Sequence, residues 1–207
     1  MHSYGLNGLD LKIFDIVKDI ENGFFIEAGA NDGVRQNNTL NLELHLGWSG
    51  LLVEPNRKLA AVCADGRKKS IVENYCLVSN EVKSDKIKGF FESTNYEQSL
   101  MAQVGSVDEL HDINKTKEKE VEVPCCTLDF LLQKHSIKKI DLFVLDVEGY
   151  EKEVLSGFSI NQYKPATVVI EILSNSKNKD NIFKYFDAAN YIYKGLISGH
   201  DHLFQLK

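Results

Sequence analysis

Three short apolar runs in the chain each end in acidic or glycine-bearing residues. The runs are "FFI", "GLLV" and "IDLFVL", and they are followed by "EAGANDG", "EPN" and "DVEG" respectively. Continuous apolar runs of this length are typical of strands buried on both faces of a parallel sheet. Because ligands of such sheets bind beyond the carboxyl ends of the strands, we expect the three polar segments to share one site.

Segments with helical features separate these runs. Residues 38–47 are ambiguous, because their leucines alternate with polar residues, which by periodicity favours a strand. We nevertheless predict a helix there, since two parallel buried strands need a crossover, which is nearly always helical. We predict further helices over 8–23, 56–65, 127–136, 150–157 and 178–189, and further strands over 70–79, 166–173, 191–198 and 202–207. The last two strands are close enough to pair as a hairpin. The pattern predicts an α/β fold with a mostly parallel, doubly wound sheet and a C-terminal antiparallel hairpin.

The length and composition fit one globular domain over residues 1–207. The chain is 43% hydrophobic, which is enough to form a core. Within this domain, 1–23 is an N-terminal helix. The segment 84–123 lacks a crossover pattern, and we interpret it as an insertion that forms a lid or contacts the substrate.

The charge and the cysteines disfavour several partners. The net charge of −6 does not attract a phosphate backbone, and we interpret the basic cluster Arg67-Lys68-Lys69 as a solvated loop. The four cysteines form no C-x-x-C pair, which disfavours zinc.

No apolar run approaches the ~18 residues of a membrane span or resembles an export signal, so we expect a cytoplasmic protein with free thiols. The sequence does not specify an oligomeric state.

The first polar segment suits a cationic ligand. It lacks the G-x-G-x-x-G spacing that binds a dinucleotide, and its Glu27 and Asp32 would repel a pyrophosphate. Carboxylates instead suit S-adenosylmethionine, which carries a sulfonium and an ammonium group. Gly29 and Gly33 would let the backbone approach the ligand closely. Glu54, at the end of the second run, can accept hydrogen bonds from both ribose hydroxyls.

Three separated segments resemble FkbM-type methyltransferases: "FFIEAGANDGVRQNNTLNLELHLGWSGLLVEPN", "VPCCTLDFLL" and "DLFVLDVEGYEKEVLSGF". The resemblance spans about residues 24–173. It implies a Rossmann-like methyltransferase fold, bound S-adenosylmethionine and O-methylation, often of sugars or secondary metabolites. Many members have a lysine shortly before the "DVEG" motif, where this chain has Val144 and Leu145, so that lysine's role does not transfer. The implied cofactor contacts are Glu27, Gly29, Ala30, Asn31, Asp32, Gly33, Glu54, Pro55 and Asn56.

Methyl transfer is a one-step displacement, so the protein mainly aligns an acceptor hydroxyl with the methyl group. Asp146, Glu171 and His200 are the candidate general bases, and Glu148 and His202 are candidates for the acceptor side. Asp146, Glu148 and Glu171 could also hold Mg²⁺ or Ca²⁺, although we expect a metal-independent reaction.

We therefore predict O-methylation of a sugar, a glycan or a small metabolite. Two alternatives remain open: a methyltransferase for the ribose 2′-oxygen of RNA, which the acidic charge disfavours, and a non-catalytic binding scaffold.

Overall fold

The structure is a computed structural model, and it describes residues 1–92, 102–104 and 118–207. Its large sheet has the strand order β10-β11-β9-β8-β1-β2-β3. Strand β11 runs antiparallel to both of its neighbours, and the pairs from β9 to β3 are parallel. The strands are β1 (Phe24–Ala28), β2 (Ser49–Val53), β3 (Ile71–Glu73), β8 (Leu142–Leu145), β9 (Thr167–Glu171), β10 (Tyr191–Ser198) and β11 (Asp201–Leu206). This arrangement confirms the predicted fold class.

The helices lie close to their predicted positions. They are the 3-10 helix η1 (Leu6–Gly8), α1 (Leu9–Val17), α2 (Leu40–His45), α3 (Arg57–Gly66), α4 (Leu128–Lys134), α5 (Glu151–Ser156), α6 (Ile160–Tyr163) and α7 (Lys179–Ala188). Helix α2 confirms the crossover argument for 38–47. The short helix α6 was not predicted.

The first helix ends at Val17, six residues before the predicted end at position 23. After α1 the chain packs against the loop that follows α2. Ile20 accepts a hydrogen bond from the indole Nε1 of Trp48 (2.8 Å), and Asn22 N donates to Leu46 O (2.9 Å). These non-local contacts replace further helical turns, and no sequence pattern in 18–23 reveals them.

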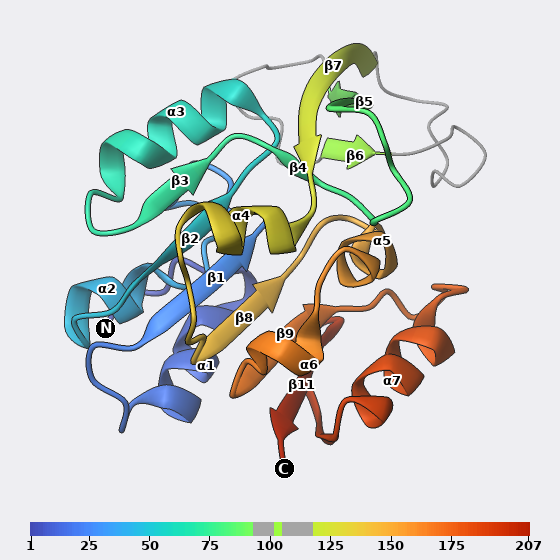
Figure 1. Cartoon of the computed structure of the whole chain (residues 1–207). Coiled ribbons are helices and arrows are strands. Elements are labelled where there is room, and N and C mark those ends of the chain that lie inside the picture. The colour runs from blue at the N-terminus through green and yellow to red at the C-terminus, as the bar shows by residue number, and fades with distance from the viewer. Residues whose placement is uncertain (93–101, 105–117) are drawn as a thin grey trace.

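The central strands β1, β2, β8 and β9 of the large sheet are buried between helices on both faces, as their apolar runs predict (Figure 1). Alternate side chains face opposite sides, so Ile26 and Phe143 join the core beneath α4 to α7. Phe25 and Val144 join the core on the other face, with residues of α1 to α3. The carboxyl ends of β1, β2, β8 and β9 are thereby held in fixed positions along one edge.

A second sheet lies beyond the carboxyl end of β8 (Figure 1), with the order β4-β7-β5-β6. Its strands are β4 (Cys76–Leu77), β5 (Lys86–Glu92), β6 (Ala102–Val104) and β7 (Glu118–Cys126). The predicted strand over 70–79 is thus divided between β3 and β4. The side chain of Asn74 causes the break, because its Nδ2 donates to Glu54 O (2.8 Å) and Pro55 O (2.9 Å) and turns the chain away from the large sheet.

The segment 84–123 therefore contributes strands to this second sheet. The rest of the proposed lid, 93–101 and 105–117, lies outside the described residues. The single-domain organisation and the role of the insertion stay predictions. All four cysteines are free thiols. Within the described ranges, no helix is long and apolar enough to cross a membrane.

Candidate functional site

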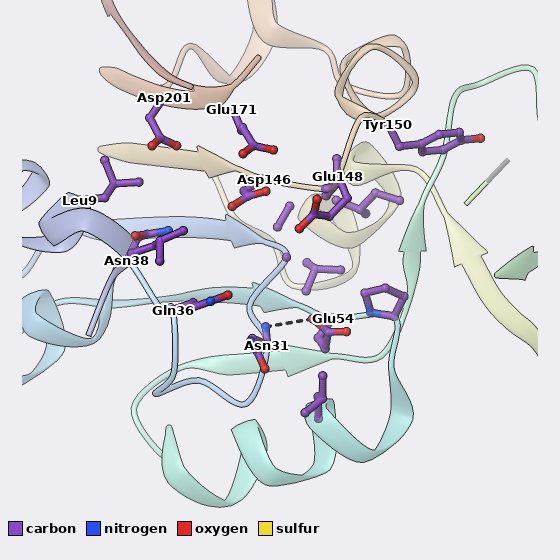
Figure 2. Close-up of a pocket in the computed structure, with 18 of the residues that line it drawn as sticks. Leu9, Asn31, Gln36, Asn38, Glu54, Asp146, Glu148, Tyr150, Glu171 and Asp201 are labelled. Carbon is purple, nitrogen blue, oxygen red and sulfur yellow. Dashed lines mark hydrogen bonds between the residues drawn. The ribbon is translucent and has the colours of Figure 1, made fainter. Parts of the chain in front are cut away.

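A cavity lies at the carboxyl edge of the large sheet, between the ends of its strands and the N-terminal segment (Figure 2). It also receives residues from β4 and from the turn between β10 and β11. Eight of the residues singled out from the sequence line this cavity: Gly29, Asn31, Glu54, Pro55, Asp146, Glu148, Glu171 and His200. The three polar segments that follow the apolar runs therefore do meet at one place.

The turn after β1 forms one wall of the cavity. The backbone N–H groups of Gly29 and Ala30 both donate to Val53 O, at 3.0 and 3.1 Å, which ties the turn to the end of β2. Gly29 has a φ of 89°, and a Cβ there would lie 1.8 Å from the carbonyl oxygen of Asp146. Only glycine fits, because the turns after β1 and β8 touch at this point.

Glu54 faces the cavity from the end of β2. Its carboxylate accepts hydrogen bonds from Asn31 N (2.9 Å, dashed in Figure 2) and Asn56 N (2.8 Å). Burial raises the pKa of Glu54 to about 7, although the two backbone hydrogen bonds oppose this shift. The carboxylate is thus fixed by the backbone and keeps lone pairs for a ligand.

Five of the predicted cofactor contacts do not line the cavity: Glu27, Ala30, Asp32, Gly33 and Asn56. Asn56 caps α3, and Asp32 accepts from Val34 N (2.9 Å) and from Arg35 N and Nε (both 2.7 Å). Burial favours a higher pKa for Asp32, but the hydrogen bonds from Arg35 outweigh it and the pKa is lowered.

Two further members of this group are turned into the protein. Gly33 (φ 79°) packs against Cys63 and Arg67 rather than against open space. The carboxylate of Glu27 is fully buried, where it accepts from Asn37, Asn38 and Thr39. Burial raises its pKa, which the charge of Arg67 partly offsets. These residues shape the turn from behind instead of facing the cavity.

Three carboxyl groups form a row across adjacent strands. Asp201 pairs with Glu171 in the register of β11 and β9, and Asp146 follows Leu145, whose partner in β9 is Ile170. The side chains of Asp146, Glu171 and Asp201 therefore point the same way, into the cavity (Figure 2). Asp201 was missed from the sequence, because only strand pairing places the start of β11 beside the end of β9.

The carboxyl groups of this row all have pKa values above those of isolated carboxyl groups. Burial and the charge of Glu171 raise the pKa of Asp146 well above its usual value. Burial and neighbouring carboxylates raise the pKa of Glu171 to about 7. The two side chains are hydrogen bonded to each other, and the buried Oε2 of Glu171 finds no donor among the described residues. The pair therefore titrates as one coupled unit, and one Glu171 oxygen stays open to a ligand.

The loop after β8 presents Glu148 to the cavity. Glu148 has a φ of 56° and Gly149 a φ of 95°, a backbone conformation that costs energy at a non-glycine residue. The carboxylate of Glu151 stabilises this loop by accepting from Gly149 N (2.9 Å) and Val147 N (3.3 Å). Burial, Asp146 and Glu151 raise the pKa of Glu148 to about 7. No sequence pattern pointed to this role for Glu151.

The two candidate histidines lie in different places. His200 is exposed and lines the cavity. His202 lies two residues further along the chain but is outside the cavity, with its ring against those of Phe183 and Tyr193. Its Nδ1 lies 3.0 Å from the hydroxyl of Tyr193, and burial lowers its pKa. His202 packs in a small aromatic group instead of facing an acceptor.

The cavity joins these acidic groups to an apolar wall. Leu59, Tyr75 and Leu77 lie on the side of Glu54, and no lysine or arginine is among the lining residues that the structure describes. Likewise, no group of three or more His, Cys, Asp or Glu side chains in the described ranges is arranged to hold a metal ion. The cavity therefore suits a ligand with a positive charge, hydroxyl groups and a flat apolar part.

The interpretation of Arg67 as part of a solvated loop is wrong. Its side chain is 1% exposed and pairs with Glu43 of α2, at 2.8 Å from Nη2 to Oε1. Lys68 is exposed, as expected. The sequence does not reveal the burial of Arg67 because its partners come from α2 and from the loop before it, some 24–34 positions away.

Comparison with known sequences identifies one family. The model of the methyltransferase FkbM domain matches residues 27–193. A curated protein from Beauveria bassiana (strain ARSEF 2860), named Methyltransferase 1, is 35% identical over 88 residues, which are 41% of this chain. The match spans 35% of the length of that relative.

Comparison with solved structures identifies the fold. A TehB-like SAM-dependent methyltransferase from Corynebacterium glutamicum is 10% identical, with a TM-score of 0.51 over 96% of this chain and 87% of that one. A ribosomal protein L11 methylase from Lactobacillus delbrueckii subsp. bulgaricus is 9% identical, with a TM-score of 0.51 over 97% of this chain and 77% of that one. The fold is thus that of S-adenosylmethionine-dependent methyltransferases.

Proposed function

The chain belongs to the FkbM methyltransferase domain family, and from this premise we propose that it transfers a methyl group from S-adenosylmethionine to a hydroxyl of a sugar, a glycan or another small metabolite. The observation that carries the proposal is the acidic cavity at the carboxyl edge of the large sheet. Carboxyl groups from the ends of β2, β8 and β9 face this one space.

The residues of the cavity fit S-adenosylmethionine. Glu54, fixed by two backbone hydrogen bonds, is placed to accept from the two ribose hydroxyls. The apolar side chains of Leu59 and Leu77, together with Tyr75, provide a surface for an adenine ring. The lack of lysine or arginine among the described lining residues disfavours a pyrophosphate and favours a sulfonium and an ammonium group.

When bound, S-adenosylmethionine supplies an activated methyl group whose bond to sulfur breaks as the bond to the acceptor oxygen forms. The electron pair of the broken bond stays on sulfur, and the hydroxyl proton must leave the acceptor. The residues of the chain therefore have two tasks, which are to align the acceptor hydroxyl and to accept its proton.

The Asp146–Glu171 pair is placed to accept this proton. Burial and neighbouring carboxyl groups raise the pKa of both side chains, so an ionised group of this pair is a stronger base than an isolated carboxylate. Burial raises the pKa of Glu171 to about 7, which suits proton transfer near neutral pH. Glu148 and His200 line the same cavity and complete the proposed acceptor side.

A polyhydroxylated acceptor fits the remaining carboxyl groups. Asp201 lies beside Glu171, and burial raises its pKa to about 6, against the opposing effect of His200 and Lys12. Carboxylates accept hydrogen bonds from hydroxyl groups, whereas they repel the phosphates of an RNA acceptor. This charge distribution favours a sugar over RNA.

Two binding measurements and one assay test the proposal. We expect calorimetry to detect S-adenosylhomocysteine binding, and NAD not to compete with it. We then expect radiolabelled methyl transfer to at least one sugar in an acceptor screen, with the rate in Glu171→Gln reduced by about 10²-fold or more while S-adenosylhomocysteine still binds. Lack of S-adenosylhomocysteine binding, or competition by NAD, would contradict the cofactor assignment. Transfer to RNA but to no sugar would contradict the acceptor class.

A further inference from the structure

A fully buried arginine lies behind the turn that forms the cavity wall. Arg67 follows α3, and its guanidinium packs 5.6 Å from the ring centroid of Phe25. Its Nε and Nη2 lie 2.9 and 2.8 Å from Glu43 Oε1. A buried cation needs a specific set of partners, because burial removes its hydration.

The other contacts of Arg67 are with the loop between β1 and α2. Nη1 donates to Gly33 O (2.9 Å) and to Asn37 Oδ1 (2.7 Å), and Nη2 donates to Thr39 Oγ1 (3.0 Å). One planar group therefore joins the middle of the loop to the start of α2. A lysine could not reproduce this arrangement, since its ammonium is a single point of charge.

Glu27 holds the same stretch of chain from the other side. Its carboxylate accepts from Asn37 Nδ2 (2.8 Å), Asn38 N (2.7 Å) and Thr39 Oγ1 (2.6 Å). Residues 37–39 are thus held between one buried anion and one buried cation. The side chain of Asn37 contacts both, through its amide nitrogen and its oxygen respectively.

The loop that these contacts fix faces the cavity. Asn31, Gln36 and Asn38 all line it, and Figure 2 shows their side chains along one wall. Asn31 (φ 53°) and Gln36 (φ 50°) both adopt left-handed backbone conformations. Such conformations persist only where surrounding contacts impose them. Asn31 N donates to Glu54, and Gln36 directly precedes the stretch over residues 37–39 that Arg67 and Glu27 hold.

We propose that Arg67 is a positioning residue that, together with Glu27, sets the shape of the loop over residues 29–39 for binding of the methyl donor. Arg67 does not line the cavity and acts through the loop. The inference rests on the proposed function, because it assigns Arg67 to the donor part of the same site.

The first test compares donor-site affinity with stability in the full chain. We expect Arg67→Lys to raise the Kd for S-adenosylhomocysteine at least about fivefold in calorimetry, because the forked contacts are lost while the charge remains. The matched control is Arg57→Lys, an exposed arginine at the start of α3, for which we expect an unchanged Kd. Leu132→Ala, in the core on the opposite face, should lower the thermal unfolding midpoint without changing the Kd.

A double variant separates positioning from stability. Arg67→Met alone leaves Glu43 as an unpaired buried anion, whereas Arg67→Met with Glu43→Met removes both charges. We expect the double variant to regain thermal stability relative to Arg67→Met and yet to bind S-adenosylhomocysteine weakly, since the ties to Gly33, Asn37 and Thr39 are still missing.

The outcomes distinguish the two proposals. Wild-type affinity in folded Arg67→Lys, or recovery of affinity in the double variant, would overturn the positioning role alone. Failure of the wild-type protein to bind S-adenosylhomocysteine would overturn the proposed function and this inference with it.

Discussion

At the scale of single residues, burial changes the chemistry of the acidic side chains more than sequence position does. Glu54 and Glu73 both end parallel strands, yet burial raises the pKa of Glu54 to about 7. For Glu73, burial acts in the same direction but hydrogen bonds from Lys134 and His135 outweigh it, so its pKa is lowered. Glu54 faces the cavity, whereas Glu73 does not line it and forms an ion pair with Lys134.

This contrast gives a matched pair of variants. We expect Glu54→Gln to raise the Kd for S-adenosylhomocysteine at least about tenfold, which is about 1.4 kcal/mol. The amide NH₂ of glutamine would replace one carboxylate oxygen of Glu54, so it cannot accept a hydrogen bond from the ribose or from a backbone N–H. Calorimetry at about pH 7.5, just above the raised pKa of Glu54, measures the effect. Glu73→Gln should leave the Kd unchanged, and equal affinities in both variants would remove Glu54 from the ribose site.

At the scale of elements, the site depends on how closely neighbouring turns approach one another. The turn after β1 contacts the carbonyl of Asp146 after β8, and the turn after β2 is held by Asn74 from the next strand. These contacts fix the relative positions of the side chains that line the cavity. The site is therefore sensitive to changes that add no charge and remove no functional group.

Gly29→Ala tests this dependence. The new Cβ would lie 1.8 Å from Asp146 O at a backbone φ of 89°, so the turns after β1 and β8 must separate. We expect loss of measurable S-adenosylhomocysteine binding and a lower free energy of unfolding, by about 2 kcal/mol or more in urea denaturation.

Gly66→Ala is the control for this variant. Gly66 ends α3, and a Cβ added to it would have no neighbouring atom within 4 Å, so alanine should fit without strain. We expect unchanged binding and a stability equal to or slightly above that of the wild type. Normal binding by Gly29→Ala would contradict the close contact between the two turns.

Thr127 tests the start of α4, which lies in the helix predicted over 127–136. Its side chain accepts from Phe130 N, which makes Thr127 the N-cap of this helix. We expect Thr127→Ala to lower the free energy of unfolding by about 1 kcal/mol and to leave S-adenosylhomocysteine binding unchanged, since α4 does not line the cavity. A stability equal to that of the wild type in urea denaturation would contradict the capping role.

At the scale of the whole molecule, the cavity costs stability in the absence of a ligand. Glu54, Glu148 and Glu171 all have pKa values raised from 4.5 to about 7. At a pH between these two values, the folded state therefore holds more protons than the unfolded state. Stability must fall as the pH rises through this window. Asp32 and Glu73 act in the opposite sense, but below their ordinary pKa values and thus outside this window. His202, whose pKa is lowered from 6.5, opposes the fall inside the window, but it is one group against three.

We therefore expect the free energy of unfolding of the ligand-free protein to decrease from about pH 5 to about pH 7.5. Glu54→Gln should remove part of this decrease, up to about 3 kcal/mol, since a pKa unit corresponds to about 1.4 kcal/mol. Urea denaturation at several pH values measures the change of the free energy of unfolding with pH in the wild type and in Glu54→Gln. A stability that rises over this range in the wild type would contradict the raised pKa values.

Much of the fold could be predicted from the order of apolar and polar residues in short segments of the chain. Apolar runs bounded by turns predicted β1, β2, β8 and β9, and the need for a crossover predicted α2, because these rules depend on nearby residues. The placement of Glu54 and Asp146 along one edge followed from the parallel direction of the strands. The family resemblance added the methyl donor.

Only the tertiary structure decided which side chains face the cavity and what surrounds them. Asp201 joins the carboxyl row through strand pairing, and Arg67 is buried by partners from α2 and the preceding loop. Glu27 has the same charge as Glu54 but faces away from the cavity. Local sequence determines where strands and turns form, whereas the direction and burial of a charged side chain depend on residues far away in the chain, and so they emerge only when the whole chain is packed.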